Sequence, residues 1–245
     1  MINMKKTWQQ QWNVVYGVNK DPNREFLLFP LLLKTSLPIK GKSIIDLGCG
    51  NGSLIVKLLK YKPKEIYGLD SNDQFLKFAK NNISDKRVRF LKSDIRRRLP
   101  IRSRHFDMAY CTFVFNETNN LDSILKEVSR VLKRKGRFYL MTTHPFFPLN
   151  YFLYEKFTGK RNNKIRNVKG YFRNYKGGYI LTMARRTTPF YNHRVEELIN
   201  LMVKNGLIIR EVRELSTNSK LLKACPIYAQ LKDIPRVILI SAEKA

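Results

Sequence analysis

The sequence is poor in the residues that mark secreted, metal-binding and membrane-spanning proteins. Its three cysteines, Cys49, Cys111 and Cys225, are too few and too scattered for a disulfide framework or a zinc site. We therefore expect a reducing, cytoplasmic setting and no bound metal. The longest apolar run, Phe26 to Leu33, has eight residues and contains Pro30, and no apolar stretch follows the first lysines. We expect neither a membrane span nor a signal peptide.

Acidic residues are also scarce. The 245 residues include 19 Asp and Glu against 47 Lys and Arg, which gives a formal net charge of +28. Such an excess concerns partners and solubility rather than fold. The chain is 43% hydrophobic and 12% aromatic, which is enough to bury a core and excludes a disordered basic tail. Its length fits one domain, residues 1–245.

The hydrophobic pattern alternates between strands and helices. Helical patterns cover residues 4–16 and 24–36, and from Ser43 onward short apolar runs alternate with segments of helical length. The expected strands are 43–47, 65–69, 88–91, 106–111 and 137–143, and the expected helices between them are 52–61, 72–82 and 120–133. Alternation of this kind predicts βαβ units, and hence a doubly wound, mostly parallel sheet with helices on both faces.

The alternation fails late in the chain. A helix over 194–205 precedes two strands, 207–212 and 236–241, with no helical pattern between them, which favours an antiparallel hairpin at the sheet edge. Residues 145–193 are rich in aromatic and basic side chains. Placed after the fifth strand, this segment would lie over the carboxyl ends of the strands, where ligands bind in open α/β sheets. We interpret it as a lid or substrate-binding insertion.

A glycine-rich turn follows the first strand. Gly48, Gly50 and Gly52 stand at alternate positions after Asp46, and a helix follows them. Glycine allows a sharp turn and a close approach of the backbone to a ligand. The spacing is G-x-G-x-G rather than the G-x-G-x-x-G of dinucleotide sites. A carboxylate two residues before the first glycine favours a ligand with a cationic end over a pyrophosphate, and S-adenosylmethionine has an ammonium, a sulfonium and no phosphate.

Two further acids end the next two strands. Asp70 follows the second strand, where a carboxylate can accept both hydroxyls of a ribose. Asp94 follows the third strand and could accept from an adenine amino group, with Ile95 packed on the ring. We expect Ser71 or Asn72 to cap the following helix, which would leave Asp70 free for a ligand.

These motifs resemble those of the class I S-adenosylmethionine-dependent methyltransferases, over nearly the whole chain. The segments that carry the resemblance are IIDLGCGNGS, YGLDSN, KSDI, FDMAYCTFVFNE and LDSILKEVSRVLKRKGRFYLMT, the last being similar to the small-molecule and ubiquinone-type branch. The His193-Arg194 pair before the last helix also resembles a bacterial and archaeal subgroup. The resemblance implies a Rossmann-like sheet of seven strands with an antiparallel edge hairpin, N-terminal lid helices (1–40), a cofactor-binding core (41–144), the insertion (145–193) and a C-terminal part (194–245).

The resemblance also implies a set of cofactor-binding residues. Asp46 and the glycines Gly48, Gly50 and Gly52 would hold the methionine moiety. Asp70 would hold the ribose, and Phe75, Asp94 and Ile95 would hold the adenine. Cys111 would offer mainly its backbone, and Tyr16 and Arg24 would belong to the N-terminal lid. The alternatives are simple core packing for Phe75, a buried apolar role for Cys111, and a solvated loop acid beside Arg96 for Asp94.

Methyl transfer from a sulfonium is an in-line displacement, so the protein must align the reactants, exclude water and, for a protonated nucleophile, remove a proton. Candidate bases are His144, directly after the fifth strand, and His193, with Glu117 as a third. A structural hydrogen bond for His144 and a helix cap or substrate contact for His193 are the alternatives.

Three functions compete. A small-molecule methyltransferase acting on a nitrogen, oxygen or carbon is favoured by the aromatic insertion. An RNA or other nucleic-acid methyltransferase is favoured by charge, because residues 156–195 contain eleven Lys and Arg and no acid, and 85–104 contain nine, including Arg96, Arg97 and Arg98. The fourth strand lacks the Asn/Asp-Pro-Pro-aromatic loop of enzymes that methylate base amines. A cofactor-binding protein without catalysis is the third interpretation. The sequence does not reveal the oligomeric state.

Overall fold

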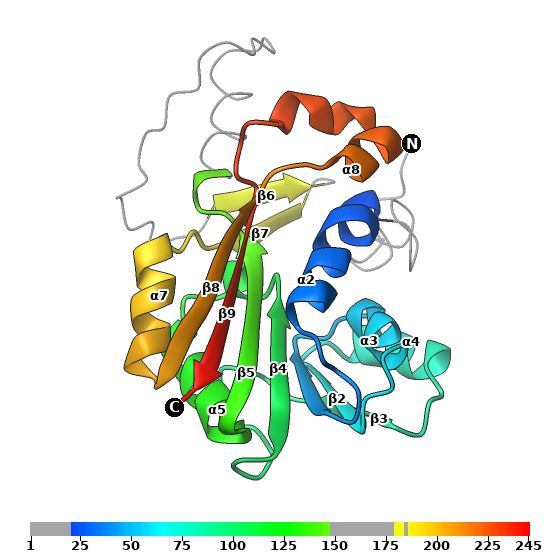
Figure 1. The fold of residues 1–245 in the computed structure, drawn as a ribbon, viewed down its shortest axis with the longest axis vertical. Helices are drawn as coiled ribbons and strands as arrows, with labels where there is room; N and C mark the ends of the chain where they lie inside the picture. Colours follow the sequence, from blue (N-terminus) through cyan, green and yellow to red (C-terminus); the bar gives the residue numbers. More distant parts are fainter. Residues whose placement is uncertain (1–20, 148–178, 184–185) are drawn as a thin grey trace.

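The computed structural model describes residues 21–147, 179–183 and 186–245 (Figure 1). The elements of its main sheet and the helices that connect them are β1 (Ser43–Leu47), α3 (Ser53–Leu59), β2 (Glu65–Asp70), α4 (Asp73–Asn82), β3 (Val88–Lys92), β4 (Phe106–Thr112), η2 (Phe115–Glu117), α5 (Leu121–Val131), β5 (Leu132–Thr143), α7 (Val195–Lys204), β8 (Leu207–Leu215) and β9 (Val237–Lys244). The predicted alternation is confirmed. The predicted helix 120–133 ends at Val131 instead, because Leu132 already pairs with Phe106 as the start of β5.

The seven strands form one sheet in the order β3-β2-β1-β4-β5-β9-β8. The pairs from β3 to β5 are parallel, and β9 runs antiparallel to both β5 and β8. The carboxyl ends of β1, β2 and β4 therefore meet at one edge of the sheet (Figure 1). The expected mostly parallel sheet with an antiparallel edge pair is confirmed.

The connection between β8 and β9 differs from the sequence prediction. It contains a short helix, α8 (Ser219–Ala224), and a 3-10 helix, η3 (Pro226–Leu231), where no helical pattern was expected. Six residues are too few to show a clear period of 3.6. The local signal for α8 is its cap, because the Asn218 side chain accepts the N–H of Leu221 at 2.8 Å.

Two hydrophobic cores cover the two faces of the sheet. Side chains alternate along each strand, so that Ile45 of β1 faces the core under α5 and α7, while Ile44 faces the core under α3 and the N-terminal helix. In the second core Leu28 and Leu32 of the N-terminal helix are buried against Ile55 of α3. The N-terminal helix is thereby held beside the glycine-rich turn that precedes α3.

The N-terminal helix consists of a π-helical part, η1 (Arg24–Leu28), and an α-helical part, α2 (Phe29–Thr35). Pro30 has no N–H, so it cannot donate to the carbonyl of Phe26 four residues earlier. The side chain of Asn218 donates to that carbonyl instead, at 2.9 Å. Asn218 therefore joins the start of α8 to the N-terminal helix.

The predicted insertion is described in part. Strands β6 (Tyr179–Met183) and β7 (Arg186–Phe190) form a separate antiparallel pair, and Tyr191 donates its backbone N–H to the carbonyl of Asn116 at 2.8 Å. Tyr16, the first predicted helix and most of the basic segment 156–195 lie outside the described residues. Within the described part of the chain, no helix is long and apolar enough to cross a membrane.

Candidate active site

The turn between β1 and α3 passes close to the loop after β4. Gly48 has a φ of 73°, and a Cβ at this position would lie 2.2 Å from Cγ2 of Val114. The backbone N–H groups of Gly48 and Cys49 both donate to the carbonyl of Leu69, at 2.8 and 2.9 Å. Only glycine combines this backbone conformation with this close approach. The first glycine of the motif is therefore required by the fold itself.

The second glycine of the motif faces open space. Gly50 has a φ of 53°, and no atom of the described residues would lie within 4 Å of a Cβ placed there. Its N–H donates to Oδ2 of Asp70 at 2.8 Å, and Oδ1 of Asp70 accepts the N–H of Asn72, also at 2.8 Å. The expected cap at Asn72 is confirmed, since its side chain accepts the N–H groups of Gln74 and Phe75. The Asp70 carboxylate, however, is held by backbone donors rather than free.

Asp46 is buried behind this turn without compensation. Its side chain is 1% exposed, and among the described residues neither carboxylate oxygen has a hydrogen-bond partner. Burial and, to a smaller extent, the charge of Asp70 raise the pKa of Asp46, Arg24 lowers it, and the net result is a pKa of about 7. A buried carboxylate without donors is costly unless a cationic or donor group of a ligand completes it.

Arg24 connects the N-terminal helix to the glycine turn. Its guanidinium lies 3.4 Å from Oγ of Ser53, the first residue of α3, and 3.6 Å from the carboxylate of Asp21. Burial lowers the pKa of Arg24, while Asp21 and Asp46 raise it. A second link joins the same elements, because Lys57 of α3 pairs with Glu25 at 2.7 Å. The predicted lid residue Arg24 therefore belongs to the same site as Asp46.

The residues predicted for the adenine are less closely grouped. Arg96 donates to both carboxylate oxygens of Asp94 at 2.8 Å, and Arg97 lies 3.8 Å from the same group. These bonds lower the pKa of Asp94. Ile95 is buried in the core under α5, and Phe75 is half-buried on α4. An adenine contact for Asp94, Ile95 and Phe75 stays a prediction.

Cys111 lies at the end of β4, fully buried in the core under α5. Burial raises the pKa of its thiol, so the group stays protonated and is no nucleophile at neutral pH. The position agrees with a role for the Cys111 backbone only.

His144 has a partner at each ring nitrogen. Nδ1 accepts the N–H of Phe146 at 3.1 Å, and Nε2 lies 2.7 Å from Oε1 of Glu214 on β8. A neutral ring that accepts at Nδ1 carries its proton at Nε2 and donates it to Glu214. Burial lowers the pKa of His144 although Glu214 opposes the shift. This geometry matches the structural alternative, in which His144 ends β5.

His193 is likewise bound to the backbone. Its Nε2 lies 2.8 Å from the carbonyl of Thr118 and 3.0 Å from that of Phe115, and its Nδ1 lies 3.5 Å from Glu197. Two carbonyls can share one N–H, so Nε2 is the protonated nitrogen. His193 thereby ties the loop after β4 to the start of α7.

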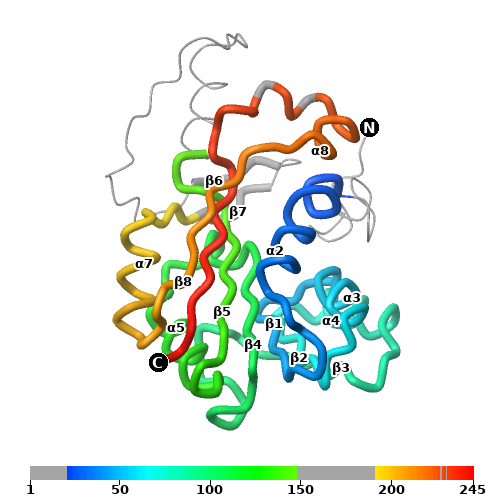
Figure 2. The backbone as a smooth tube through the Cα atoms, in the orientation of Figure 1, coloured from blue at the N-terminus to red at the C-terminus, as the bar shows by residue number. Residues whose placement is uncertain are grey.

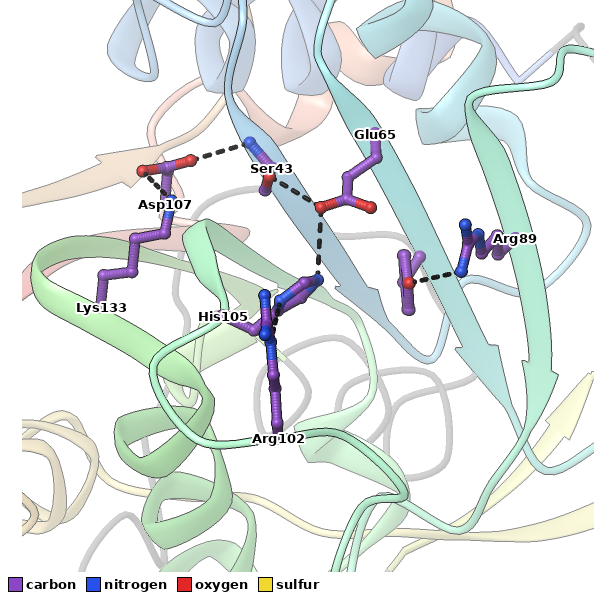
Figure 3. A network of polar contacts seen from close by, with 8 residues as sticks. Ser43, Glu65, Arg89, Arg102, His105, Asp107 and Lys133 are labelled. Atoms are coloured by element: carbon purple, nitrogen blue, oxygen red, sulfur yellow. Dashed lines mark hydrogen bonds and ion pairs between the residues drawn. The ribbon is translucent and has the colours of Figure 1, made fainter.

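The third histidine lies at the opposite end of the sheet. Figure 3 shows His105 between Arg102, which donates to Nδ1 at 2.9 Å, and Glu65, whose carboxylate lies 3.3 Å from Nε2. Asp107 beside it accepts the N–H of Ser43 and pairs with Lys133, both at 2.9 Å. This network joins the amino ends of β1, β2 and β4 and does not reach the turn at Gly48.

Glu117, the third candidate base, differs from His144 and His193 in its surroundings. Its side chain is accessible to solvent, and within the described part of the chain it has no hydrogen-bond or ion-pair partner. Surrounding protein and the charge of Asp70 nevertheless raise the pKa of Glu117. A carboxylate with a raised pKa close to Asp70 is suited to accept a proton.

Sequence reasoning missed Asn116, which organises the same loop. Its buried side chain accepts from the Thr142 hydroxyl at 2.6 Å and from the N–H of Thr143 at 3.1 Å, and it donates to the carbonyl of Tyr191 at 3.3 Å. Asn116 therefore joins β5, the loop after β4 and the end of the insertion. A polar residue between Phe115 and Glu117 gives no sequence signal for this role.

Comparison with known proteins places these features in a class. Residues 45–140 match the family described as "Methyltransferase domain". The chain is 34% identical over 111 residues to the demethylmenaquinone methyltransferase of Thermotoga maritima, which covers 44% of this chain and 47% of the relative. It is 31% identical over 144 residues to the tRNA U34 carboxymethyltransferase of Helicobacter pylori strain P12, which covers 56% and 53%. The chain thus spans about half the length of the curated relatives it matches.

The fold agrees over a longer stretch. A solved S-adenosylmethionine-dependent methyltransferase from Mesorhizobium loti superimposes with a TM-score of 0.74 at 21% identity, over 88% of this chain and 96% of that chain. Residues 45–140 thus match a methyltransferase domain, and the chain has the fold of S-adenosylmethionine-dependent methyltransferases. The cofactor that this similarity implies is S-adenosylmethionine.

The site fits this cofactor. The two unpartnered oxygens of Asp46 match the cofactor's ammonium group, which would supply both charge and donors. The open side of Gly50 leaves its backbone accessible to the ligand. Asp70 lies one hydrogen bond away from Gly50, at the position predicted for the ribose.

Proposed function

We propose that this chain transfers a methyl group from S-adenosylmethionine to a small-molecule acceptor through a nitrogen, oxygen or carbon nucleophile. The observation that carries the proposal is Asp46, a buried carboxylate without donors beside an open glycine turn in a matched methyltransferase domain. The aromatic composition of residues 145–193 and the quinone-type substrate in the name of the Thermotoga relative support a small acceptor.

The residues of the crevice have distinct roles in this proposal. Asp46 and the turn from Gly48 to Gly52 hold the amino-acid end of the cofactor, and Asp70 holds the ribose. Arg24 and Tyr16 close over them from the N-terminal side. When bound, S-adenosylmethionine supplies the methyl group and its own leaving group. The chain then aligns the acceptor and excludes water.

We assign the proton-accepting role to Glu117 where the nucleophile carries a proton. It has no competing partner in the described residues, whereas the ring nitrogens of His144 and His193 are bound to Glu214, Phe146 and backbone carbonyls. We expect Glu117→Gln to lower the rate of methyl transfer at least tenfold and to leave the affinity for S-adenosylhomocysteine within threefold. An unchanged rate in this variant would return the role to His144 or His193.

Radiolabelled methyl transfer to separate cell fractions tests the acceptor class. The full chain and S-adenosylmethionine with a labelled methyl group are incubated with a small-molecule extract, with total RNA and with protein. We expect label in the small-molecule fraction, and none with an Asp46→Ala variant. Label in RNA alone overturns the small-molecule proposal. Cofactor binding without label in any fraction supports a protein without catalysis.

RNA is the second candidate acceptor, and two observations favour it. Several curated relatives are tRNA U34 carboxymethyltransferases, and Arg97 is 85% exposed beside Arg96 and Arg98. Phosphate contacts make RNA affinity fall steeply with salt. Neutralising Arg96 to Arg98 should flatten that slope if these residues bind RNA, while no binding to bulk RNA at about 150 mM salt would exclude RNA as the acceptor.

We infer a cytoplasmic setting from the free cysteines.

A further inference from the structure

Arg236 is a buried cation at the carboxyl end of the sheet. It precedes β9, donates its backbone N–H to the carbonyl of Leu215 at 2.7 Å and accepts the N–H of His144 at 2.9 Å. The residue is 3% exposed. The backbone of Arg236 is therefore fixed beside the end of β5. The start of β9 and the end of β5 lie at the same edge of the sheet as the carboxyl end of β1 (Figure 2).

The guanidinium of Arg236 is only partly satisfied. Nη2 donates to Oδ1 of Asn23 at 2.6 Å, and the group lies over the rings of Tyr228 and Phe147, 4.3 and 5.9 Å from their centres. Nη1 is buried, and nothing in the described ranges accepts its hydrogens. Asp21 attracts Arg236 electrostatically, but its carboxylate is bound to the N–H of Asn23 and to Arg24 instead.

Arg130 shows how a partly buried guanidinium is fully hydrogen-bonded elsewhere in this chain. Arg130 donates to both carboxylate oxygens of Glu127, at 2.6 and 2.8 Å, and to the carbonyls of Leu99 and Ile101. Arg236 is more deeply buried, and among the described residues it has one amide oxygen in place of these acceptors. Leaving a buried charge uncompensated destabilises a fold, so this arrangement indicates a group that binds there.

The surroundings of Arg236 lead directly to the cofactor site. Asn23 contacts Arg236, and the next residue, Arg24, contacts Ser53 at the end of the glycine turn. Tyr228 belongs to η3, and Phe147 is a described residue near the start of the insertion. Aromatic rings beside a guanidinium accommodate the flat, apolar part of a ligand whose oxyanion pairs with the cation.

We propose that Arg236 forms a subsite for an anionic group, a carboxylate or a phosphate, on the acceptor substrate. Nη1 donates to the oxyanion, Asn23 holds the guanidinium in place through Nη2, and Tyr228 and Phe147 pack against the adjoining part of the acceptor. This assignment rests on the proposed methyltransferase function, and it narrows the acceptor to acidic molecules.

Binding of small anionic probes tests the subsite. The full chain, saturated with S-adenosylhomocysteine, is titrated by calorimetry with benzoate and separately with phenyl phosphate, at constant ionic strength. We expect saturable binding of at least one probe, and the tighter probe identifies the oxyanion. Arg236→Met should weaken that binding at least tenfold, and Arg236→Lys should weaken it less. The control Arg213→Met removes an exposed arginine of β8 that pairs with Glu211, and it should change nothing.

A second variant protects the test against loss of folding. Asn23→Asp places a carboxylate where Nη2 of Arg236 already has its acceptor. It should raise the melting temperature and weaken probe binding at least threefold, because the arginine then has its own counter-ion. Equal probe affinity in wild type, Arg236→Met and Asn23→Asp would overturn the subsite, as would absent probe binding in protein saturated with S-adenosylhomocysteine. Absent binding of S-adenosylhomocysteine would contradict the proposed function instead, and the probes are then titrated alone.

Discussion

The carboxylate of Asp70 accepts the backbone N–H of Gly50 at 2.8 Å, so the end of β2 fixes the shape of the turn that follows β1. The other oxygen of Asp70 accepts the N–H of Asn72, which begins α4. One side chain thus joins the starts of two helices at the cofactor site. An acid predicted for a ribose contact also holds the turn that is predicted to contact the amino-acid end of the ligand.

Asp70→Ala should therefore weaken cofactor binding in two ways, because it removes the predicted ribose contact and the acceptor that holds the N–H of Gly50. We expect the affinity for S-adenosylhomocysteine to fall about 10- to 100-fold, since charge-assisted hydrogen bonds contribute about 1.5 to 3 kcal/mol each. Calorimetry measures the change. The control is Asp73→Ala, which removes an exposed carboxylate three positions away that pairs with Lys92. Equal affinities for the two variants would contradict the role of Asp70.

The raised pKa of Asp46 predicts a pH dependence of cofactor binding. In the ligand-free protein this carboxyl has a pKa of about 7, and the cofactor's ammonium favours its ionised form. The affinity should fall as the pH drops from about 7.5 to 5.5, approaching tenfold per pH unit. Measurements stay below about pH 7.5 because free α-amino groups titrate near 7.7 to 8.0.

Asp46→Asn provides the control for this pH dependence. The amide does not titrate, so its weaker binding should be nearly constant over the same range. Calorimetry in two buffers of different ionisation enthalpy should also detect proton release on binding to the wild type below about pH 7. A flat profile for the wild type would show that Asp46 is ionised before the ligand binds.

The spacing of the sequence predicted those parts of the site that follow from the sheet. In a parallel sheet the carboxyl ends of strands share one edge, so Asp46, Asp70 and Asp94 could be placed together from pattern alone. The cap at Asn72 was predictable because its signal is local. The antiparallel pair at the edge was predictable because the alternation of strands and helices fails there.

The remaining features depend on contacts between distant segments. Arg236 meets Asn23 across 213 positions, and Asn116 meets Thr142 and Thr143 across a helix. The hydrophobic periodicity of a sequence does not indicate which distant residues form such hydrogen bonds. The partner of His144 was also hidden, because Glu214 lies on β8, which neighbours β9 rather than β5.

Asp46 should destabilise the ligand-free protein. Its pKa is about 7 in the folded state and near 4 in the unfolded state, so above about pH 7 the folded protein carries a costly buried charge. As the pH falls from about 7 toward 4, the carboxyl of the folded protein is protonated and this destabilisation decreases. Asp46→Asn should raise the free energy of unfolding by about 1 to 3 kcal/mol near pH 8, and less near pH 5. Each kcal/mol corresponds to about 2 to 4 °C in Tm for a chain of this size.

Asp107→Asn is the matched control with the opposite sign. The carboxylate of Asp107 accepts from Ser43 and Lys133, and these partners lower its pKa. Its replacement should lower Tm at pH 8, because the hydrogen bonds from Ser43 and Lys133 then lose their charged acceptor. Thermal unfolding of both variants without cofactor measures the difference. A lower Tm for Asp46→Asn would show that the buried carboxylate is stabilised in the free protein.

We expect His193 mainly to stabilise the loop after β4. Its Nε2 lies within hydrogen-bond distance of the carbonyls of Phe115 and Thr118, and a phenylalanine would remove this donor from both. The carbonyl of Phe115 would keep only the long bond from the N–H of Thr118, at 3.4 Å. We expect His193→Phe to lower the free energy of unfolding by about 1 to 3 kcal/mol. His193→Gln should recover part of the loss, because an amide N–H can reach one carbonyl. Thermal unfolding measures both, and the pH profile of methyl transfer separates structure from catalysis. A structural histidine leaves the profile of the folded His193→Gln variant unchanged, whereas loss of its acidic limb would assign proton removal to His193.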